Sequence, residues 1–470
     1  MDTDTDFESS VYEHPSVLDI YLSTDDPRLN QAVDKIFKEV GFKGHGSLIK
    51  NQLKVLILNF IKLKQRKKNS NLRYSRRNDF WADHDRKNPN PWGISRKLDD
   101  VIDTLHQQGL LNFQKGFVNE GIKRQTRIQP SKKFVSRYIT PLKLLTVKLE
   151  RHKQAPLVQV HIKTPSKYTK EVHHTRYEAK GKTAIPNQLK RMKEQLKRYN
   201  GFLKGCSITL DQVPETKQAP KINFDLQKHV YRVFSDKKIS QGGRMYGGWW
   251  MHEIKSYQRP FILINGNPTV ELDYASQHAN MLYGLALGSP MSQVLGKVDP
   301  YTLAKPDSMG SYPRSLGKAF FTRALNVRNK RNLRASLLKR FKEDLKGNNE
   351  ADKQTAQECL PYVENEFDAV MAAFEKLHEP VLKPKRFLYP KIKLWGAYQF
   401  FDSQICAYVL DQMTLKGIPC LSVHDSFIVQ EQHQGTLEGV MKEAYLKVDH
   451  IPDLSKCIPE IRPIKRKKTP

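Results

Sequence analysis

The sequence predicts an α+β fold divided into several domains, and three observations support this expectation. The chain has 470 residues, of which 39% are hydrophobic, enough for about three domains of ordinary size. Apolar residues recur at helical spacing in residues 47–64, 95–108 and 186–204, which predicts helices there. Short β-branched runs at residues 269–273 and 418–429 predict strands between further helices.

Positive charge is concentrated in the first half of the chain. The sequence contains 79 Lys and Arg against 49 Asp and Glu, a formal net charge of +30. Residues 1–50 carry a net charge of −5, residues 51–250 carry +28 and residues 251–470 carry +7. Residues 301–350 hold 12 basic and 4 acidic residues. Such an excess requires a polyanionic partner, and nucleic acid suits it better than an anionic membrane.

The cysteines and the apolar segments argue against several classes of protein. Five scattered cysteines form no C-x-x-C pair, which argues against a disulfide framework and a cysteine-rich zinc site. The acidic N-terminus lacks the apolar stretch of a secretory signal, and the longest apolar run, residues 55–61, is too short to cross a bilayer. We therefore expect a cytoplasmic protein with no membrane association, and we expect a monomer.

After an acidic segment at residues 1–45, residues 46–135 are expected to form a small domain. Its helices over residues 47–64 and 95–108 precede a strand, a Gly-containing turn and a second strand over residues 110–128. This order resembles a winged helix-turn-helix domain, in which the hairpin would be the wing. The resemblance implies a DNA-binding domain.

In that domain we expect DNA contacts from the hairpin, through Arg124 and Arg127, and from the stretch between Arg73 and Arg77. The helix at residues 95–108 departs from the pattern because Asp99, Asp100 and Asp103 would be repelled by phosphates. A small helical domain with a solvated acidic face is therefore an equal alternative.

Residues 136–222 are predicted to be a basic helical region that ends in a linker at residues 205–222. The helix at residues 186–204 has an apolar face, and its opposite face carries Lys190, Lys193 and Lys197. Two interpretations remain open. The helix either packs on a core with a solvated basic face, or follows the backbone of a nucleic-acid duplex.

Residues 223–470 contain three segments that suit one kind of chemistry. In the first, a strand ends at Asp273 and an apolar helix follows. In the second, a helix carries Arg314, Lys318 and Thr322 on one face. The third reads as two short strands with Asp425 at the turn between them. Two carboxylates at neighbouring strand ends suit two Mg²⁺ ions about 3.5–4 Å apart, the arrangement used for nucleotidyl transfer.

The basic residues of the second segment complete this expectation. Arg314 offers a bidentate fork to a triphosphate, and Lys318 offers a compact charge and a proton for the leaving group. Mg²⁺ needs few protein carboxylates because substrate phosphates and waters fill its other positions. We expect two Mg²⁺ ions bound by Asp273 and Asp425, with Mn²⁺ as an alternative.

Together these segments resemble the polymerase motifs of the DNA polymerase I-like (family A) and single-subunit phage-type RNA polymerase superfamily. The sequence V-E-L-D-Y-A-S around Asp273 is similar to the first motif of that family. The R-x-x-x-K sequence from Arg314 to Lys318 is similar to its fingers helix, and V-H-D-S-F around Asp425 to its palm hairpin. The segment at residues 299–304, and Gly243-Arg244 further upstream, also match family segments.

The resemblance implies a right-hand fold, with palm and fingers in residues 223–470, fingers at about 300–350, and a thumb within residues 136–222. A short basic tail, residues 465–468, follows. The implied function is a template-directed DNA polymerase (a nucleotidyltransferase) that acts on a DNA template, primer and dNTPs. It would lack a proofreading exonuclease and replicate a phage or other mobile element in a bacterial or virus-infected cell.

The resemblance also implies roles for individual residues. The catalytic residues would be Asp273, Asp425 and Lys318, and the two aspartates would bind the metal ions. The nucleotide would be bound by Arg314, Lys318, His278, Thr322 and Tyr274. Nucleic acid would be contacted by Arg244, His424 and Gln399, and further by the basic residues Lys190, Lys193, Lys197, Arg124 and Arg127.

Three departures leave alternatives open. His278 stands where the DNA polymerases have a glutamate that excludes ribose, and a bulky residue there favours deoxynucleotides. Ser426 is the residue of the RNA polymerases. The stretch that includes Asn326 lacks the tyrosine of the fingers helix. The alternatives are a single-subunit RNA polymerase or primase on the same scaffold, or a non-catalytic DNA-binding replication initiator.

The glycine-rich segment at residues 242–250 also has two interpretations. It is either a turn with Trp249 and Trp250 as buried anchors, or a segment in which Arg244 pairs with a phosphate and the aromatic rings stack on a base.

Overall fold

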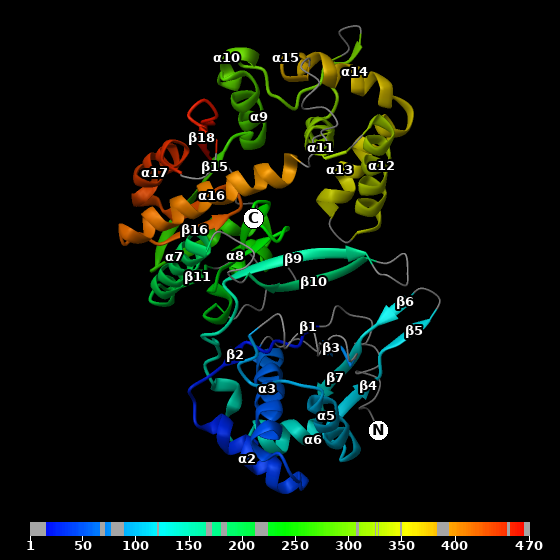
Figure 1. Ribbon diagram of the computed structural model, residues 1–470, viewed down its shortest axis with the longest axis vertical. Helices are drawn as coiled ribbons and strands as arrows, with labels where there is room; N and C mark the ends of the chain where they lie inside the picture. The colour runs from blue at the N-terminus through cyan, green and yellow to red at the C-terminus, as the bar shows by residue number, and fades with distance from the viewer. Residues whose placement is uncertain are drawn as a thin grey trace. The chain divides into compact units, whose positions relative to one another are not determined.

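The computed structural model has mixed α and β structure (Figure 1), as the sequence predicts. It describes residues 16–65, 71–76, 89–119, 122–165, 172–179, 186–211, 224–306, 310–324, 326–327, 329–347, 350–382, 394–448 and 452–464. Arg77, most of the expected linker and the basic tail lie outside these ranges. The chain forms two compact units: a first unit of residues 1–231 and 246–258, and a second unit of residues 232–245 and 259–470.

The first unit is built around a helical core and a small sheet. The helices are α2 (Arg28–Val40), α3 (Gly46–Gln65) and α5 (Lys97–Gln107). The sheet has the strand order β1-β3-β7-β4, formed by Ser16–Val17, Leu72–Tyr74, Thr126–Pro130 and Leu111–Gln114. Between β4 and β7 the chain forms a second hairpin from β5 (Phe117–Asn119) and β6 (Ile122–Arg124). The predicted helices and hairpin of this region are confirmed.

The hydrophobic core continues across the boundary that the sequence led us to place at residue 45. One cluster of buried side chains includes Ile20 and Leu29 before that boundary and Leu149 and Leu226 far beyond it. Asp19 anchors the early segment, because its backbone N–H donates to the Asn59 side chain at 2.9 Å. Residues 16–45 therefore belong to the same core as α3 and α5 and are no separate domain.

The expectation that residues 136–222 are helical is wrong in part, because this region contains a long β-hairpin ahead of the basic helix. β9 (Val158–Pro165) pairs with β10 (Val172–Glu178), and α7 spans Pro186–Lys204. The predicted apolar face of α7 is buried. The expected linker starts with a short strand, β11 (Ile208–Leu210), which sequence analysis missed because only three residues form it.

The second unit contains a sheet whose central strand is β15 (Asn267–Tyr274). On one side β15 pairs with β17 (Ser426–Gln430), which pairs with β16 (Cys420–Val423). On its other side β15 pairs with β14 (Ile262–Ile264) near its start and with β18 (Ile461–Pro463) near its end. Helices α9 (Gln277–Leu287), α16 (Leu394–Leu415) and α17 (Gln434–Lys447) complete this layer. The strands predicted around Asp273 and Asp425 are confirmed.

A group of helices completes the second unit, and α11–α14 lie together in Figure 1. They are α10 (Met291–Leu295), α11 (Arg314–Ala324), α12 (Lys330–Lys346), α13 (Glu350–Asn365), α14 (Phe367–Leu377) and α15 (Glu379–Leu382). His378 connects them to the sheet layer: its ring is fully buried and bonds the Tyr283 hydroxyl and the Pro300 carbonyl, each at 3.0 Å. Within the described ranges, no helix is both long and apolar enough to cross a membrane.

Candidate active site

The register of the sheet brings the two predicted aspartates to adjacent strand ends. Asp273 of β15 lies opposite Ser426 of β17, and the two-residue loop between β16 and β17 is His424-Asp425. The Tyr274 N–H donates to the Asp425 carbonyl at 3.4 Å. The turn that contains Asp425 therefore contacts the end of β15, where the loop that contains Ser276 begins. Residues separated by about 150 positions in the chain therefore present their carboxylates on one end of the sheet.

Each of the two loops contains a non-glycine residue with a positive φ. His424 has φ of 61° and Ser276, just after the Asp273 strand, has φ of 52°. This conformation costs an ordinary residue of order 1–3 kcal/mol, and such strain gathers at functional sites. Both strained residues lie within three positions of a predicted carboxylate, Ser276 after Asp273 and His424 before Asp425.

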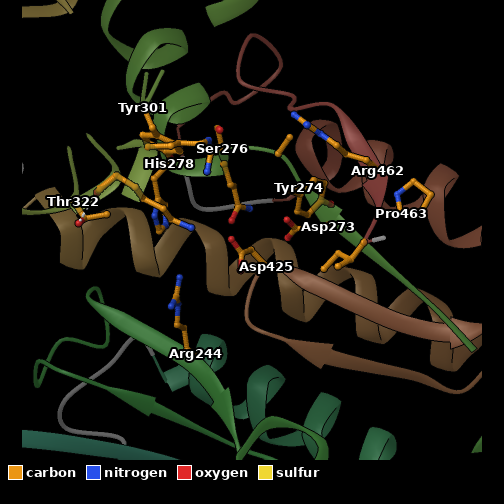
Figure 2. Close-up of a pocket in the computed structure, with 15 residues that line it drawn as sticks. Arg244, Asp273, Tyr274, Ser276, His278, Tyr301, Thr322, Asp425, Arg462 and Pro463 are labelled. Carbon is orange, nitrogen blue, oxygen red and sulfur yellow. Dashed lines mark hydrogen bonds between the residues drawn. The ribbon is translucent and has the colours of Figure 1, made fainter. Parts of the chain in front are cut away.

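A cavity of about 430 Å³ opens at these two loops, and all its lining residues belong to the second unit. Eight predicted site residues line it: Arg244, Asp273, Tyr274, His278, Arg314, Lys318, Thr322 and Asp425. Figure 2 shows the two aspartates close together, with Arg244 extending toward them from β13 (Gly242–Tyr246). Three separate sequence motifs thus converge on one cavity.

Helix α11 brings the cations of the second motif to the cavity. Arg314 is paired with Asp299 at 2.9 Å and lies over the Tyr301 ring at 5.0 Å, while Lys318 is exposed. A side chain at Gly317 would collide with the Tyr301 carbonyl, so glycine allows α11 to approach the segment at residues 299–304. This close approach places the basic face of α11 at the cavity.

Thr322 lines the cavity, but its hydroxyl is used within the helix. It donates to the carbonyls of Lys318 and Ala319, at 3.0 and 3.2 Å. Tyr274 is also engaged, because its hydroxyl donates to the Met441 carbonyl at 2.6 Å and its ring is buried. These two residues shape the wall of the cavity, and their hydroxyls are already bonded.

His278 lies on α9 at the cavity wall and is only 9% exposed. Its ring is nearly parallel to that of Tyr398, with centroids 6.3 Å apart. Burial, together with the charges of Arg244 and Lys318, lowers the pKa of His278 to about 4, although Asp425 acts in the opposite direction. The imidazole is therefore neutral at physiological pH and presents a bulky uncharged ring to the cavity.

Arg244 is held by a residue that sequence analysis did not single out. Its guanidinium forms two hydrogen-bonded contacts with one oxygen of Asp402 on α16, at 2.7 and 2.8 Å, and Asp402 is 1% exposed. The preceding Gly243 has φ of 86° and packs so closely on Phe234 and Ser403 that no Cβ would fit. Arg244 is thus fixed against α16 and directed into the cavity.

Beneath Arg244, a second arginine is completely buried. Arg232 donates to the Gly243 carbonyl at 2.7 Å and to the Ser403 hydroxyl at 2.8 Å. Burial lowers its pKa to about 10, so it remains charged at neutral pH. Arg232 therefore fastens the Gly243-Arg244 backbone to α16 through the same turn that carries Asp402.

Ser426 begins β17, directly after Asp425. Its hydroxyl donates to Glu271 of β15 at 2.6 Å. Glu271 is also paired with Arg259 at 3.1 Å, and its side chain is 8% exposed. A third carboxylate thus lies two residues before Asp273 on β15, but it is bonded and does not line the cavity.

The other predicted residues lie elsewhere. His424 stands beside Asp425 in the turn and Gln399 lies on α16 three residues before Asp402, but neither lines the cavity. Lys190, Lys193 and Lys197 lie on α7 in the first unit. Trp249 and Trp250 are fully buried, so the interpretation in which they stack on a base is wrong.

Arg124 and Arg127 belong to a group of like charges in the first unit. Arg73 of β3 lies directly opposite Arg127 of β7, and Arg124 ends β6. Burial, followed by the charges of Arg124 and Arg73, lowers the pKa of Arg127. Like charges opposite each other destabilise a sheet, so an anion bound here would relieve the repulsion.

The acidic face of α5 is neutralised within the first unit. Arg76 forms two hydrogen bonds with Asp103, at 2.6 and 2.8 Å, and lies 3.6 Å from Asp99. Asp100 is paired with Lys97 at 3.0 Å. Asp99 and Asp103 are therefore not simply solvated, as the alternative expected. Both contact Arg76, which follows β3.

Sequence analysis also missed residues that line the cavity from unexpected places. Tyr301 and Ser276 come from loops, and Arg462 comes from β18 near the end of the chain. Position in a motif would have indicated Ser276, which lies three residues after Asp273. Nothing local indicates Asp402 or Arg462, because each depends on which strand or helix its segment packs against.

The side chains at the cavity fit a magnesium site of the kind the sequence predicts. Asp273 and Asp425 would supply hard oxygen ligands, and Arg314 and Lys318, which line the same cavity, would face the substrate phosphates that complete Mg²⁺ coordination. In the part of the chain that the structure describes, no three His, Cys, Asp or Glu side chains cluster closely enough to enclose a metal by themselves.

Comparison with known proteins adds no assignment: no protein-family model and no curated protein matches this chain.

Proposed function

We propose that the protein is a template-directed DNA polymerase without a proofreading exonuclease, which uses dNTPs and divalent metal ions. One observation carries the proposal: three motifs that resemble one polymerase superfamily converge on a single cavity with two carboxylates and cations. In this proposal the β14–β18 sheet is the palm and helices α11–α14 are the fingers. Phage or mobile-element replication remains the context that the resemblance implies.

Each charged residue of the cavity has a separate role in the proposed nucleotidyl transfer. Asp273 and Asp425 would bind Mg²⁺, which supplies charge neutralisation and a lower pKa for the attacking hydroxyl. Arg314 and Lys318 bind the triphosphate, and Lys318 donates a proton to the departing pyrophosphate. Arg244, held by Asp402, contacts the primer–template from the opposite wall. The protein mainly positions and neutralises charged groups.

His278 is the proposed gate for the sugar. Its neutral ring, stacked near Tyr398 and only 9% exposed, has little freedom to move away from a 2′-hydroxyl. A rigid bulky wall rejects the larger ribose sterically. This supports dNTPs as the substrate rather than NTPs.

The first unit is proposed to bind DNA outside the active site. The strands β3, β7 and β4 adjoin in an order that suits a winged-helix sheet, with the β5–β6 hairpin at the wing position. The contacts come from Arg73, Arg124 and Arg127, whose mutual repulsion a phosphate backbone relieves. Because α5 has neutralised carboxylates, we assign it no base-reading role.

The decisive experiment incubates purified protein with a primed template, Mg²⁺, and either dNTPs or NTPs. We expect primer extension with dNTPs. Asp425→Asn should abolish extension while DNA binding is kept, and Asp453→Asn, an exposed residue outside the cavity, should behave as wild type. DNA binding without incorporation of either substrate would instead identify the non-catalytic initiator.

The second candidate is a single-subunit RNA polymerase or primase. The identity of Ser426 favours it, because serine is the residue that the phage-type RNA polymerases carry at this hairpin position. Primer-independent incorporation of NTPs in the same assay would establish this alternative. His278→Gly that newly accepts NTPs would instead support the DNA polymerase with a steric gate.

A further inference from the structure

The C-terminal strand β18 brings an arginine to the active-site cavity from outside the three motifs. β18 pairs with β15 so that Arg462 lies directly opposite Asp273. Opposed residues of antiparallel strands share one face of the sheet, with Cβ atoms roughly 4.5–5.5 Å apart. Arg462 therefore stands on the same face as the proposed catalytic carboxylate, and it lines the cavity.

The position of Arg462 is opposite to that of Asp425. β17 and its turn occupy one edge of β15, whereas β18 occupies the other edge. Asp273 thus lies between a carboxylate on one side and a guanidinium on the other. Figure 2 shows the Arg462 side chain extending over the cavity toward Ser276.

The guanidinium remains available to a ligand. The Arg462 side chain is 59% exposed, and its ion pair with Glu460 at 3.3 Å is itself exposed, since the Glu460 side chain is 71% exposed. Exposed pairs of this kind contribute little and exchange readily with another anion. The planar fork of arginine matches the oxygens of a phosphate group and suits it better than it suits a neutral base.

From this placement we propose that Arg462 binds the pyrophosphate portion of the incoming nucleoside triphosphate. This inference rests on the proposed function. Arg462 acts from the β18 edge of the sheet while Arg314 and Lys318 act from α11, so the phosphates are held from two elements. In this arrangement the primer hydroxyl lies on the Asp425 side of β15. The same guanidinium contacts pyrophosphate after the transfer.

The test measures ligand binding without chemistry. Wild-type protein on a primer–template with a dideoxy-terminated primer is titrated with the matching dNTP, and DNA-free protein is titrated separately with inorganic pyrophosphate, both in Mg²⁺ buffer. For Arg462→Ala we expect about a tenfold rise in the Kd of both ligands, as for removal of a charge-assisted hydrogen bond. Arg462→Lys should recover part of the affinity, and the Kd for DNA should not change.

Two matched variants exclude a general effect of charge or folding. Lys416→Ala removes one exposed positive charge away from the cavity lining and should bind both ligands as wild type. Glu460→Gln releases Arg462 from its ion pair and should bind at least as tightly. Wild-type affinity in Arg462→Ala, alongside weaker binding in Lys318→Ala, would overturn the inference and leave the proposed function intact. Absence of dNTP binding in wild-type protein would overturn both.

Discussion

Helices α7 and α11 are both amphipathic and basic, yet they differ in what their cations face. On α7, Lys190 and Lys197 point to solvent while the opposite apolar face is buried. On α11, Arg314 and Lys318 line a cavity that also contains Asp273 and Asp425. The same local pattern thus produces a dispersed charged surface in one unit and a convergent site in the other.

This difference shows that a basic helix in the sequence does not by itself distinguish a charged surface from a binding site. Dispersed surface charge attracts a polyanion over a long range and is screened by salt. Convergent cations beside carboxylates form a site for one defined ligand. Removal of the α7 charges is therefore expected to lower DNA affinity, whereas removal of charges at the cavity is expected to lower the rate of extension.

The largest effect is expected at the convergent site. Asp273→Asn and Asp425→Asn each keep the size of the side chain but remove a negative charge that we propose binds metal. We expect incorporation to fall by about a thousandfold or more, equivalent to roughly 4 kcal/mol of transition-state stabilisation. Single-turnover extension measures the rate, and a gel-shift titration checks that DNA affinity stays within about twofold.

Acid is expected to destabilise the second unit through two buried histidines. The pKa of His278 and that of His378 are lowered to about 4 by burial, so each binds a proton more readily when unfolded. Their contribution to stability is complete above pH 6.5 and is lost as the pH falls toward 4. Each histidine should add a slope of about 1.4 kcal/mol per pH unit in that window.

Hydrogen exchange measured between pH 7 and 5 can assign this destabilisation to α9 and to the residues around His378. His378→Gln should show a shallower pH dependence than wild type, even though its stability at pH 7 is lower. An unchanged slope in that variant would contradict the assignment. In the first unit burial also lowers the pKa of His229, to about 4, and the pKa values of His152 and His252, so we expect that unit to lose stability on acidification as well.

Removing the carboxylate that holds Arg244 should weaken the site without removing any metal ligand. In Asp402→Ala the buried anion is absent and Arg244 is free to turn away, so we expect kcat/KM to fall by roughly 10- to 100-fold. The KM for primer–template should rise more than that for dNTP. A double-mutant cycle with Arg244→Ala measures the coupling, and additive effects would show that Asp402 does not act through Arg244.

The smallest effect is expected from the dispersed charges of α7. Substituting Lys190, Lys193 and Lys197 together by alanine should lower DNA affinity by about tenfold at 0.1 M salt. The slope of log affinity against log salt should decrease by up to about 0.9 for each phosphate that the variant no longer neutralises. The rate of single-turnover extension at saturating DNA should not change.

Glu194→Ala, which removes an exposed negative charge from the same helix, serves as the control for helix stability. Its DNA affinity should stay the same or rise. If the triple variant instead lowered the extension rate as strongly as Lys318→Ala, the distinction between the two helices would disappear.

Local sequence patterns were sufficient for the elements that carry the site. Helical periodicity predicted α3, α7 and α11, and the strand–turn–strand pattern around Asp425 predicted β16 and β17, because side-chain spacing depends only on neighbours in the chain. Among the eight predicted residues that line the cavity, Arg244, Tyr274 and His278 came from the resemblance to a polymerase family, and the other five came from strand-end and helix-face patterns.

Tertiary structure decided which of these residues meet and what supports them. Asp402 fixes Arg244, Glu271 accepts a hydrogen bond from Ser426, and Arg462 lies opposite Asp273 in the sheet, all through pairing of segments far apart in the chain. It also decided that residues 16–45 share the core of α3. By itself the sequence determined the helices and strands that carry the predicted site residues. Only the packing of distant segments determined their partners, since strand register and helix contacts depend on the whole buried core.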